Sequence, residues 1–201
     1  MIKNILKEAI NEAAQNIEKL KNDTVLHNTF EKMIYMIVEC YKNGGGLFVA
    51  GNGGSAADAQ HFVAELVVKL SRDRDPLKAF ALTVDTSIIT AAANDYSYDH
   101  IFSRQVEALM TSKDIFFGIT TSGNSANILK SFEMCKKIGA RSILFSGKDG
   151  GRAVKENLAD INIIVPGDNT ARIQEAHAIL YHTICWCIEK ELIDIGFIKY
   201  R

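Results

Sequence analysis

The hydrophobic positions near the N-terminus repeat at the spacing of an α-helix. Between residues 2 and 20, Ile, Leu and Ala recur every three or four positions, with charged side chains between them. A second segment that ends near Tyr41 repeats the pattern, and three glycines at 44–46 follow it. Apolar side chains at this spacing share one helix face, and glycine commonly ends a helix. The pattern predicts two amphipathic helices within residues 1–43.

After residue 46 the pattern changes to short apolar runs, which alternate with longer helical stretches. The apolar runs lie at 47–50, 79–83, 115–119, 142–145 and 161–165. The helical stretches lie near 55–70, 86–109, 125–138, 150–157 and 172–193. Strands that are apolar on both faces and alternate with helices are typical of a parallel sheet covered on both sides. The predicted fold class is α/β, with a five-stranded parallel sheet in a single domain over residues 1–201.

Composition and charge narrow the class of protein. The chain has 201 residues, of which 47% are hydrophobic and 23% charged, with a formal net charge of -1. This balance is ordinary for one globular domain and gives no electrostatic reason to expect nucleic acid or an acidic membrane as a partner. No apolar run approaches the roughly 20 residues that span a bilayer, and acids interrupt the N-terminal segment, unlike a signal peptide. We therefore expect a cytoplasmic protein.

The first predicted strand leads into a glycine-rich loop, Gly51-Asn52-Gly53-Gly54-Ser55, and a helix follows at once. Glycine permits a tight turn with positive φ, and the Ser55 hydroxyl can cap the helix. A helix N-terminus carries unpaired N–H groups and attracts an anion. The loop matches neither the dinucleotide fingerprint nor the P-loop. A tight strand-to-helix turn without any ligand remains the alternative.

A second polar loop, Thr120-Thr121-Ser122-Gly123-Asn124-Ser125, follows the third predicted strand and also precedes a helix. Hydroxyl-rich loops at a helix N-terminus can hold phosphate oxygens without a lysine. A solvated Ser/Thr loop is the alternative. Because ligands of open α/β sheets bind beyond the carboxyl ends of the strands, the two loops are expected to face one site. Together they indicate an anion site at that edge of the sheet.

His61 and Glu65 are candidates for proton or metal chemistry. They lie four residues apart on the helix that the first loop starts, so they share one face. Such a pair can bind one metal ion or supply a base. His27 and Glu31 have the same spacing without a glycine loop nearby, and we interpret them as a surface pair. Location therefore favours His61 and Glu65.

Two further polar groups stand out on helical stretches. The last helix carries Gln174, Glu175, His177 and His182 among apolar side chains; polar residues at a helix or subunit interface are the alternative reading. Asn94-Asp95 ends an alanine-rich stretch after the second strand, where an ordinary C-terminal turn is the alternative.

Four segments carry a resemblance to a known family: GNGGSAADAQHFVAEL, TSGNSANI, GKDGG and TARIQEAHAILYH. They resemble the sugar isomerase (SIS) domain and, more narrowly, the bacterial phosphoheptose isomerases, over nearly the whole chain to about residue 193. The resemblance implies a flavodoxin-like fold and isomerisation of sedoheptulose 7-phosphate to D-glycero-D-manno-heptose 7-phosphate. That reaction is the first step toward activated heptose for surface polysaccharide, such as lipopolysaccharide or capsule. The resemblance also implies one zinc ion per subunit and a homotetramer with active sites at subunit interfaces. The apolar faces of the two N-terminal helices, within residues 1–43, are expected to make oligomer contacts.

The resemblance assigns roles to individual residues. Glu65 and His182 would be the proton-transfer pair. The metal ligands would be His61, Glu65, Gln174 and His182. The substrate-binding residues would be Asn52, Gly53, Gly54, Ser55, Glu65, Asn94, Asp95, Thr120, Thr121, Ser122, Ser125 and Gln174.

One geometric conflict arises within this ligand set. Gln174 and His182 are eight residues apart, which is about 12 Å along a regular helix, whereas a zinc ligand must come within ~2.1 Å of the metal. Either Gln174 lies on a distorted first turn or the two ligands come from different subunits. We expect the second arrangement.

The segments SAADAQHF, TARIQE and ANDYSY also resemble a protein that associates with the DnaA replication initiator. A tetrameric regulator that binds this initiator is therefore the alternative function. A third reading is a sugar-phosphate-sensing module that uses the loops without a base. The isomerase is the preferred interpretation.

Overall fold

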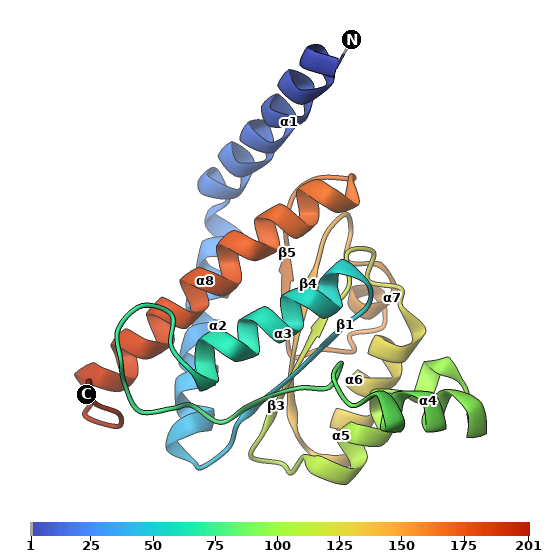
Figure 1. Cartoon of the computed structure of the whole chain (residues 1–201), viewed down its shortest axis with the longest axis vertical. Helices are drawn as coiled ribbons and strands as arrows, with labels where there is room; N and C mark the ends of the chain where they lie inside the picture. Colours follow the sequence, from blue (N-terminus) through green and yellow to red (C-terminus); the bar gives the residue numbers. More distant parts are fainter. Residues whose placement is uncertain (1) are drawn as a thin grey trace.

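The computed structural model describes residues 2–201 and has at its centre a five-stranded sheet with strand order β2-β1-β3-β4-β5 (Figure 1). All four strand pairings are parallel. This is the order of flavodoxin-like doubly wound sheets, so the predicted fold class is confirmed. The strands are β1 (Leu47–Gly51), β2 (Ala79–Ala81), β3 (Ile115–Ile119), β4 (Arg141–Ser146) and β5 (Ile161–Ile164).

The helices follow the predicted stretches closely at most positions. Side-chain caps fix several starts: Asp23 accepts from the Leu26 amide, and Asp85 accepts from the Ile88 amide. Such caps satisfy amides that have no partner inside the helix. The helices are α1 (Ile2–Asn22), α2 (Thr24–Lys42), α3 (Gly54–Val67), α4 (Thr86–Asp95), α5 (Ser103–Leu109), α6 (Ala126–Ile138), α7 (Gly151–Lys155) and α8 (Thr170–Asp194).

The sheet divides the hydrophobic core into two halves. Because alternate side chains of a strand point to opposite faces, Leu47 and Val49 pack on one side and Phe48 and Ala50 on the other. Helices α2, α3 and α8 cover the first face, and α4, α5 and α6 cover the second (Figure 1). Both faces are buried, which explains why the strands read as continuous apolar runs.

The predicted helix over 86–109 is wrong as one element. Helix α4 ends at Asp95, a 3-10 turn covers Tyr98–His100, and α5 begins at Ser103. The Ser97 amide turns back to bond the carbonyl of Ala92. The break buries two consecutive apolar residues, Ile101 and Phe102, which a continuous amphipathic helix could not direct into the same core.

Two local expectations also differ from the structure. Strand β2 ends at Ala81, two residues before the predicted end. Helix α3 begins at Gly54 with Gly53 as its N-cap, and no side chain bonds the cap. Because the helix starts one residue earlier than expected, the Ser55 hydroxyl does not cap it, and Ser55 is buried instead.

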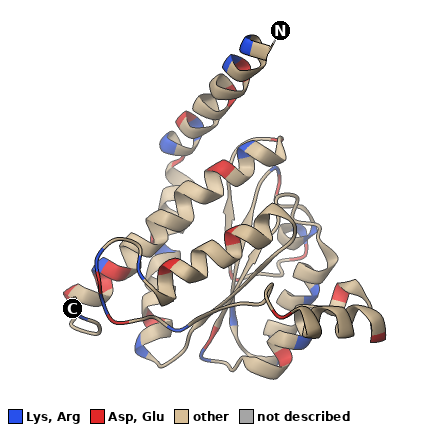
Figure 2. Cartoon of the chain, in the orientation of Figure 1, with Lys and Arg blue, Asp and Glu red and all other residues tan. Residues whose placement is uncertain are grey.

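Helix α1 projects away from the body of the domain (Figure 1). Its outer turns leave large apolar side chains in solvent, including Ile2 at 82% and Leu6 at 62% exposure. No helix within residues 2–201 is long and apolar enough to cross a membrane. Charges of both signs are interspersed over the ribbon in Figure 2, in agreement with the net charge of -1.

Candidate active site

A cavity of about 320 Å³ lies where the β1–α3 loop, the β3–α6 loop and the start of α8 meet. This is the carboxyl edge of the sheet, where ligands of such folds bind. The cavity brings together eight of the predicted substrate residues and adds Ile119 and Thr170, which the sequence reading did not include. The predicted residues that line it are Asn52, Gly53, Gly54, Ser55, Thr120, Thr121, Ser125 and Gln174.

Two glycines with positive φ shape the loops around this cavity, and at the second of them a side chain would not fit. Gly53 has φ of +56° and lets the chain turn directly from β1 into α3. Gly123 has φ of +65°, and a Cβ there would lie 1.9 Å from the carbonyl oxygen of Gly150. The close approach packs the second loop against the loop that follows β4. Both positions thus require glycine.

The polar side chains of the two loops bond one another. The Thr120 and Ser125 hydroxyls are 2.9 Å apart, and Thr120 is buried. The Asn52 and Asn127 side-chain amides form a reciprocal pair with N–O distances of 2.9 and 2.8 Å, and the Tyr98 hydroxyl donates to Asn52 at 3.2 Å. Asn127 and Tyr98 were not predicted as site residues. The Asn52–Asn127 pair thus ties the first loop to the first turn of α6, which follows the second loop.

The cavity suits an anion that is bound without a cationic side chain. None of its ten lining residues is Lys, Arg, Asp or Glu. Helices α3 and α6 begin at its edge, and Thr170 is the first residue of α8. Helix N-termini supply unpaired N–H groups and a partial positive charge, and the threonine and serine hydroxyls add donors. The site can therefore hold a phosphate group.

Four predicted substrate residues do not line this cavity: Glu65, which belongs to the cluster described next, and Ser122, Asn94 and Asp95. The Ser122 hydroxyl accepts from the Asn124 amide at 3.3 Å within its own loop. Asn94 and Asp95 lie at the end of α4, where Asn94 donates to the Asp95 carboxylate. Asp95 instead borders a separate groove between α4 and α5. Within one protomer, Ser122, Asn94 and Asp95 therefore do not line the anion cavity.

His61, Glu65 and His182 form a second polar centre between α3 and α8. Their ligand atoms all lie within 4.8 Å of one another. His61 Nε2 is 3.0 Å from Glu65 Oε1, and the two imidazole rings are 5.0 Å apart, edge to face. The structure thus joins the predicted proton-transfer pair with the predicted histidine ligand, although His182 is far away in the sequence. Helices α3 and α8 bring the three side chains together by packing side by side.

The donors of this cluster fit a divalent metal. Two histidines and one carboxylate are a common ligand set for catalytic zinc, with a further position left open. The second carboxylate oxygen, Glu65 Oε2, is buried and has no hydrogen-bond partner among the described residues. A buried unpaired acceptor is costly unless another group satisfies it. A cation held between these side chains would do so.

Gln174, the fourth predicted ligand, lies beside the anion cavity. A Cβ added at Gly54 would come within 2.5 Å of Gln174 Nε2, so the glutamine side chain packs on the first turn of α3. Helix α8 is continuous from Thr170, which leaves no distorted first turn to carry Gln174 toward His182. The two residues are therefore about 12 Å apart along one helix.

Three residues around the cluster were not predicted from the sequence. Tyr181 is buried and bonds His61 Nδ1 at 3.0 Å. Arg74 donates to the carbonyls of Glu65 and Leu66, the last turn of α3. Asp58 has a buried oxygen without a partner among the described residues, and burial raises the pKa of its carboxyl. Of the three, only Asp58 could have been predicted from the sequence, since it lies one turn before His61 on the same helix.

The other polar residues of α8 have structural partners. His177 is fully buried, and its Nε2 donates to the carbonyl of Ser146 at 3.2 Å. Burial lowers the pKa of His177 to about 4, so the imidazole is neutral near pH 7. Glu175 pairs with Arg172 on the helix surface. His27 and Glu31 make separate contacts, since His27 bonds the carbonyl of Leu20 and Glu31 accepts from Tyr35.

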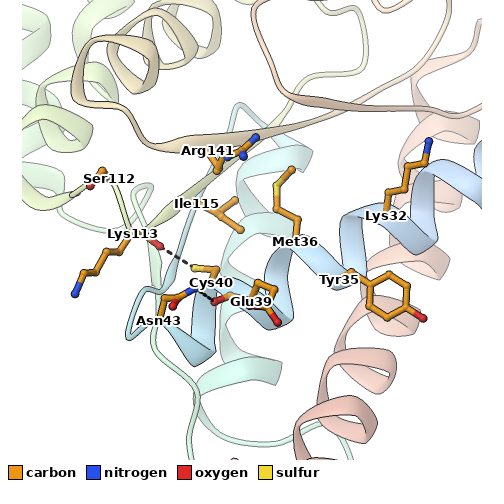
Figure 3. A pocket seen from close by; sticks show the side chains of 10 residues that line it. All are labelled: Lys32, Tyr35, Met36, Glu39, Cys40, Asn43, Ser112, Lys113, Ile115 and Arg141. Atoms are coloured by element: carbon orange, nitrogen blue, oxygen red, sulfur yellow. Dashed lines mark hydrogen bonds between the residues drawn. The ribbon is translucent and has the colours of Figure 1, made fainter.

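Another cavity, of about 670 Å³, lies at the opposite end of the sheet, beside the first residues of β3 and β4 (Figure 3). Its lining contains Cys40, whose Sγ donates to the carbonyl of Lys113. Burial raises the pKa of the Cys40 thiol to about 12, so it is not a nucleophile near pH 7. The cavity lining contains Glu39 and three cationic side chains but no histidine–carboxylate pair, and the carboxyl edge remains the candidate site.

A flavodoxin-like sheet with glycine- and hydroxyl-rich loops around an anion cavity defines a protein of the SIS class. Residues 1–147 match the family described as SIS domain, and the chain belongs to that family. A phosphoheptose isomerase from Clostridium acetobutylicum is 44% identical over 191 residues, which cover 95% of this chain and 96% of that protein. One from Sulfurimonas denitrificans is 44% identical over 195 residues, covering 97% and 99%. Within the SIS proteins, the chain belongs to the phosphoheptose isomerase family.

Solved structures agree with this assignment. A phosphoheptose isomerase from Francisella tularensis superposes with a TM-score of 0.89 at 35% identity, covering 94% of this chain and 99% of that one. One from Neisseria gonorrhoeae superposes with a TM-score of 0.86 at 36% identity, covering 94% and 100%. The similarity therefore extends over the whole domain.

Proposed function

We propose that this protein is a sugar-phosphate isomerase that converts sedoheptulose 7-phosphate to D-glycero-D-manno-heptose 7-phosphate. The observation that carries the proposal is the pairing of two centres on α3, an anion cavity without cationic side chains and the cluster of His61, Glu65 and His182. A phosphate and a proton-transfer centre are what an isomerase of phosphorylated sugars requires. Family membership supports the substrate, since the relatives above are named phosphoheptose isomerases.

The phosphate of the substrate would bind at the two loops. Thr120, Thr121 and Ser125 offer hydroxyls, and Gly53 and Gly54 bring backbone amides to the same cavity. Asn52 would contact the sugar, and Ser55 and Ser122 would support the loop backbones. Asn94 and Asp95 would act on substrate only from a neighbouring subunit or after movement of α4, because they do not line this cavity.

Proton transfer would belong to Glu65 and His182. An aldose–ketose isomerisation removes a proton from C1, forms an enediol and returns the proton at C2. Glu65 is the proposed base, because its carboxylate lies in one cluster with the imidazole of His182. His182 is the proposed acid, which would help to open the sugar ring and move the proton between O1 and O2. Positioned acid–base groups typically contribute ~10²–10⁴-fold to such a rate.

A zinc ion is proposed to be held by His61, Glu65 and His182, with Gln174 as a fourth ligand. When bound, the ion would polarise the carbonyl and hydroxyl oxygens of the substrate and stabilise the negative charge that develops there. A carboxylate that binds a metal is a weaker base, so metal binding and proton transfer at Glu65 would dominate at different steps. Glu65 Oε1 already faces His61, and the buried Glu65 Oε2 has no partner among the described residues.

We further propose that each active site combines two subunits of a homotetramer. Glu65 lies eleven residues after Gly54, about 16 Å along α3, which exceeds the reach from the phosphorus to C2 of a heptulose 7-phosphate. Gln174 is similarly remote from His182 on its own helix. A partner that docks its loops and Gln174 against this cluster would resolve both distances. The exposed apolar face of α1 supports such an assembly.

The enzyme would act in the cytoplasm, because a charged sugar phosphate does not cross a membrane unaided. Its product would enter the synthesis of activated heptose for lipopolysaccharide or capsule. The relatives above give no support to the alternative of a DnaA-binding regulator, and the cluster of acid and base groups favours the enzyme.

The test is turnover by the purified protein. Sedoheptulose 7-phosphate should be converted to the aldose, with exchange of one carbon-bound proton with solvent detected by NMR in D₂O. Unphosphorylated sedoheptulose is the control and should react far more slowly at the same concentration. Absence of turnover in a folded protein supplied with Zn²⁺ would contradict the proposed activity.

A further inference from the structure

The hydroxyl of Tyr181 contacts the imidazole of His61 on the side opposite Glu65. Tyr181 Oη lies 3.0 Å from His61 Nδ1, and Glu65 Oε1 lies 3.0 Å from His61 Nε2. Both ring nitrogens of His61 are therefore engaged, one by a hydroxyl and one by a carboxylate. A ring with two fixed partners cannot rotate without breaking a hydrogen bond.

The Tyr181 ring also packs against the other histidine of the cluster. Its centroid lies 5.4 Å from that of His61 and 4.6 Å from that of His182. The ring is 3% exposed and stacks on Phe62, which belongs to the buried face of α3. A single rigid side chain thus orients both imidazoles, and core packing holds that side chain in turn.

Hydrogen-bond direction restricts the role that this hydroxyl can play. A carboxylate only accepts, so in the described structure His61 Nε2 carries a proton and donates to Glu65. A neutral His61 then has a bare Nδ1, to which Tyr181 must donate. A metal at Nε2 requires the opposite tautomer, in which Nδ1 carries the proton and Tyr181 must accept. A hydroxyl can do both, whereas a carbonyl or an amide N–H can do only one.

The hydroxyl needs an acceptor for its own hydrogen in the second state. Asp58, one turn before His61, has a buried Oδ2 without a partner among the described residues. Asp58 and His61 are three residues apart on α3, so their side chains share one helix face. An acceptor is therefore present on the same face of α3.

We infer that Tyr181 is the positioning residue of the metal centre. Its hydroxyl fixes the orientation of His61 and reverses its hydrogen bond when the ring changes from the tautomer that bonds Glu65 to the tautomer that binds a metal. This inference rests on the metal site of the proposed function and adds to it the group that holds its first ligand. Removal of such a partner typically weakens metal binding 10–100-fold.

Tyr181→Phe tests the inference, because it keeps the ring and deletes only the hydroxyl. Zn²⁺ affinity is measured by competition with a chromophoric chelator, and the Co²⁺-loaded protein is compared by visible absorption. We expect the affinity to fall 10–100-fold and the cobalt spectrum to change. Tyr41→Phe is the matched control, since Tyr41 is also buried in the core and its hydroxyl has no partner among the described residues. Its affinity should stay within about twofold of wild type, well below the loss expected for Tyr181→Phe.

Thermal unfolding of both variants separates a positioning effect from a loss of fold. A second measurement needs no variant: in the zinc-loaded wild type, ¹⁵N-edited NMR should find the His61 proton on Nδ1 and protected from solvent exchange. Wild-type affinity in folded Tyr181→Phe, a wild type that does not bind Zn²⁺, or a loaded His61 with its proton elsewhere would overturn the inference. None of these measurements uses turnover, so a protein that binds zinc but fails to isomerise the sugar would refute only the proposed activity.

Discussion

The two carboxylate oxygens of Glu65 have different surroundings, which makes this residue the most informative single position. Oε1 accepts from His61, whereas Oε2 is buried and unpaired among the described residues. The unpaired oxygen carries the desolvation cost of a buried acceptor without any compensating bond. Such an atom is rare in a folded protein unless a ligand or a reaction uses it.

Glu65→Gln should abolish turnover of sedoheptulose 7-phosphate while the phosphate still binds, because the loops are untouched. The expected loss in kcat is ~10²–10⁴-fold, the usual size of an acid–base contribution. Glu31→Gln is the matched control, since Glu31 has the same spacing from a histidine but lies exposed on α2. Retention of more than about a tenth of wild-type kcat would remove Glu65 from the role of base.

Thr121 lines the anion cavity and its neighbour Ser122 does not, so substitutions at the two positions test the phosphate site. Thr121→Val should raise KM by about 10–100-fold, since a hydrogen bond to a charged group is worth ~1.5–3 kcal/mol. The kcat should change little, because the phosphate is remote from the reacting carbons and its contacts are the same in ground and transition states. Ser122→Ala, at the neighbouring hydroxyl, should have a much smaller effect. A collapse of kcat with unchanged KM in steady-state kinetics would place the loop at the reacting end instead.

Because His177 is buried in its neutral form, the free energy of unfolding should fall in mild acid. Its pKa is about 4 in the folded chain and about 6.5 when unfolded, so the unfolded chain binds more protons between these values. The stabilisation is complete above pH 6.5 and is lost progressively toward pH 4, by about 3 kcal/mol in all. Urea midpoints at pH 7 and pH 4.5 should therefore differ more for the wild type than for His177→Gln. Equal differences would show that His177 does not couple protonation to folding.

At the scale of elements, the site depends on how α3 and α8 are held side by side. Arg74 is 2% exposed and donates to the carbonyls of Glu65 and Leu66 at 2.8 and 3.0 Å. It also donates to the carboxylate of Glu189, on α8, at 2.9 Å. One guanidinium thus satisfies the open end of α3 and ties it to α8. This contact holds the end of α3, where Glu65 lies, against α8.

Arg74→Met should destabilise the protein by about 3–5 kcal/mol, because it leaves the Glu189 carboxylate buried and unpaired. The double variant Arg74→Met/Glu189→Leu should recover part of this loss, since both charges are then absent. Urea unfolding at fixed protein concentration measures the series. A loss of less than about 1 kcal/mol in the single variant would indicate that water reaches the pair and replaces the bond.

At the scale of the whole molecule, one protomer keeps its anion cavity and its histidine–carboxylate cluster apart. Glu65 and His182 belong to the same protomer cluster, whereas Gln174 belongs to the cavity. A site completed by a second copy would use the cluster of one subunit and the loops of another. The exposed apolar stripe of α1 offers the kind of surface through which copies associate.

Mixing two inactive variants tests this arrangement. Glu65→Gln supplies an intact Gln174, and Gln174→Ala supplies an intact cluster, so after subunit exchange some sites should be wild type. Random exchange should restore about a quarter of the sites in a symmetric oligomer. Mixing Glu65→Gln with His182→Ala is the control and should restore nothing, because both residues lie in one protomer cluster. Exchanged oligomers, verified by mass-tagged subunits, that stay inactive in the first mixture would contradict a shared site.

Much of the fold could be predicted from the sequence because its determinants are local. Strands buried on both faces read as continuous apolar runs, and the helices between them repeat every three to four residues. The two polar loops were found for the same reason, since each directly follows a strand and precedes a helix. The break between α4 and α5 was missed, because burial of Ile101 and Phe102 depends on the core they enter and not on local periodicity.

The sequence alone determined the α/β class, the glycine- and hydroxyl-rich loops and the His61–Glu65 pair, all of which depend on residues within a turn or two of each other. Only the tertiary structure decided which distant residues meet. Tyr181 bonds His61 across 120 positions, and Arg74 bonds Glu189 across 115. It also placed Gln174 at the anion cavity and His182 beside His61, and no spacing rule places either of them relative to α3. Contacts between helices depend on how their faces pack on the sheet, and that information is spread over the whole core.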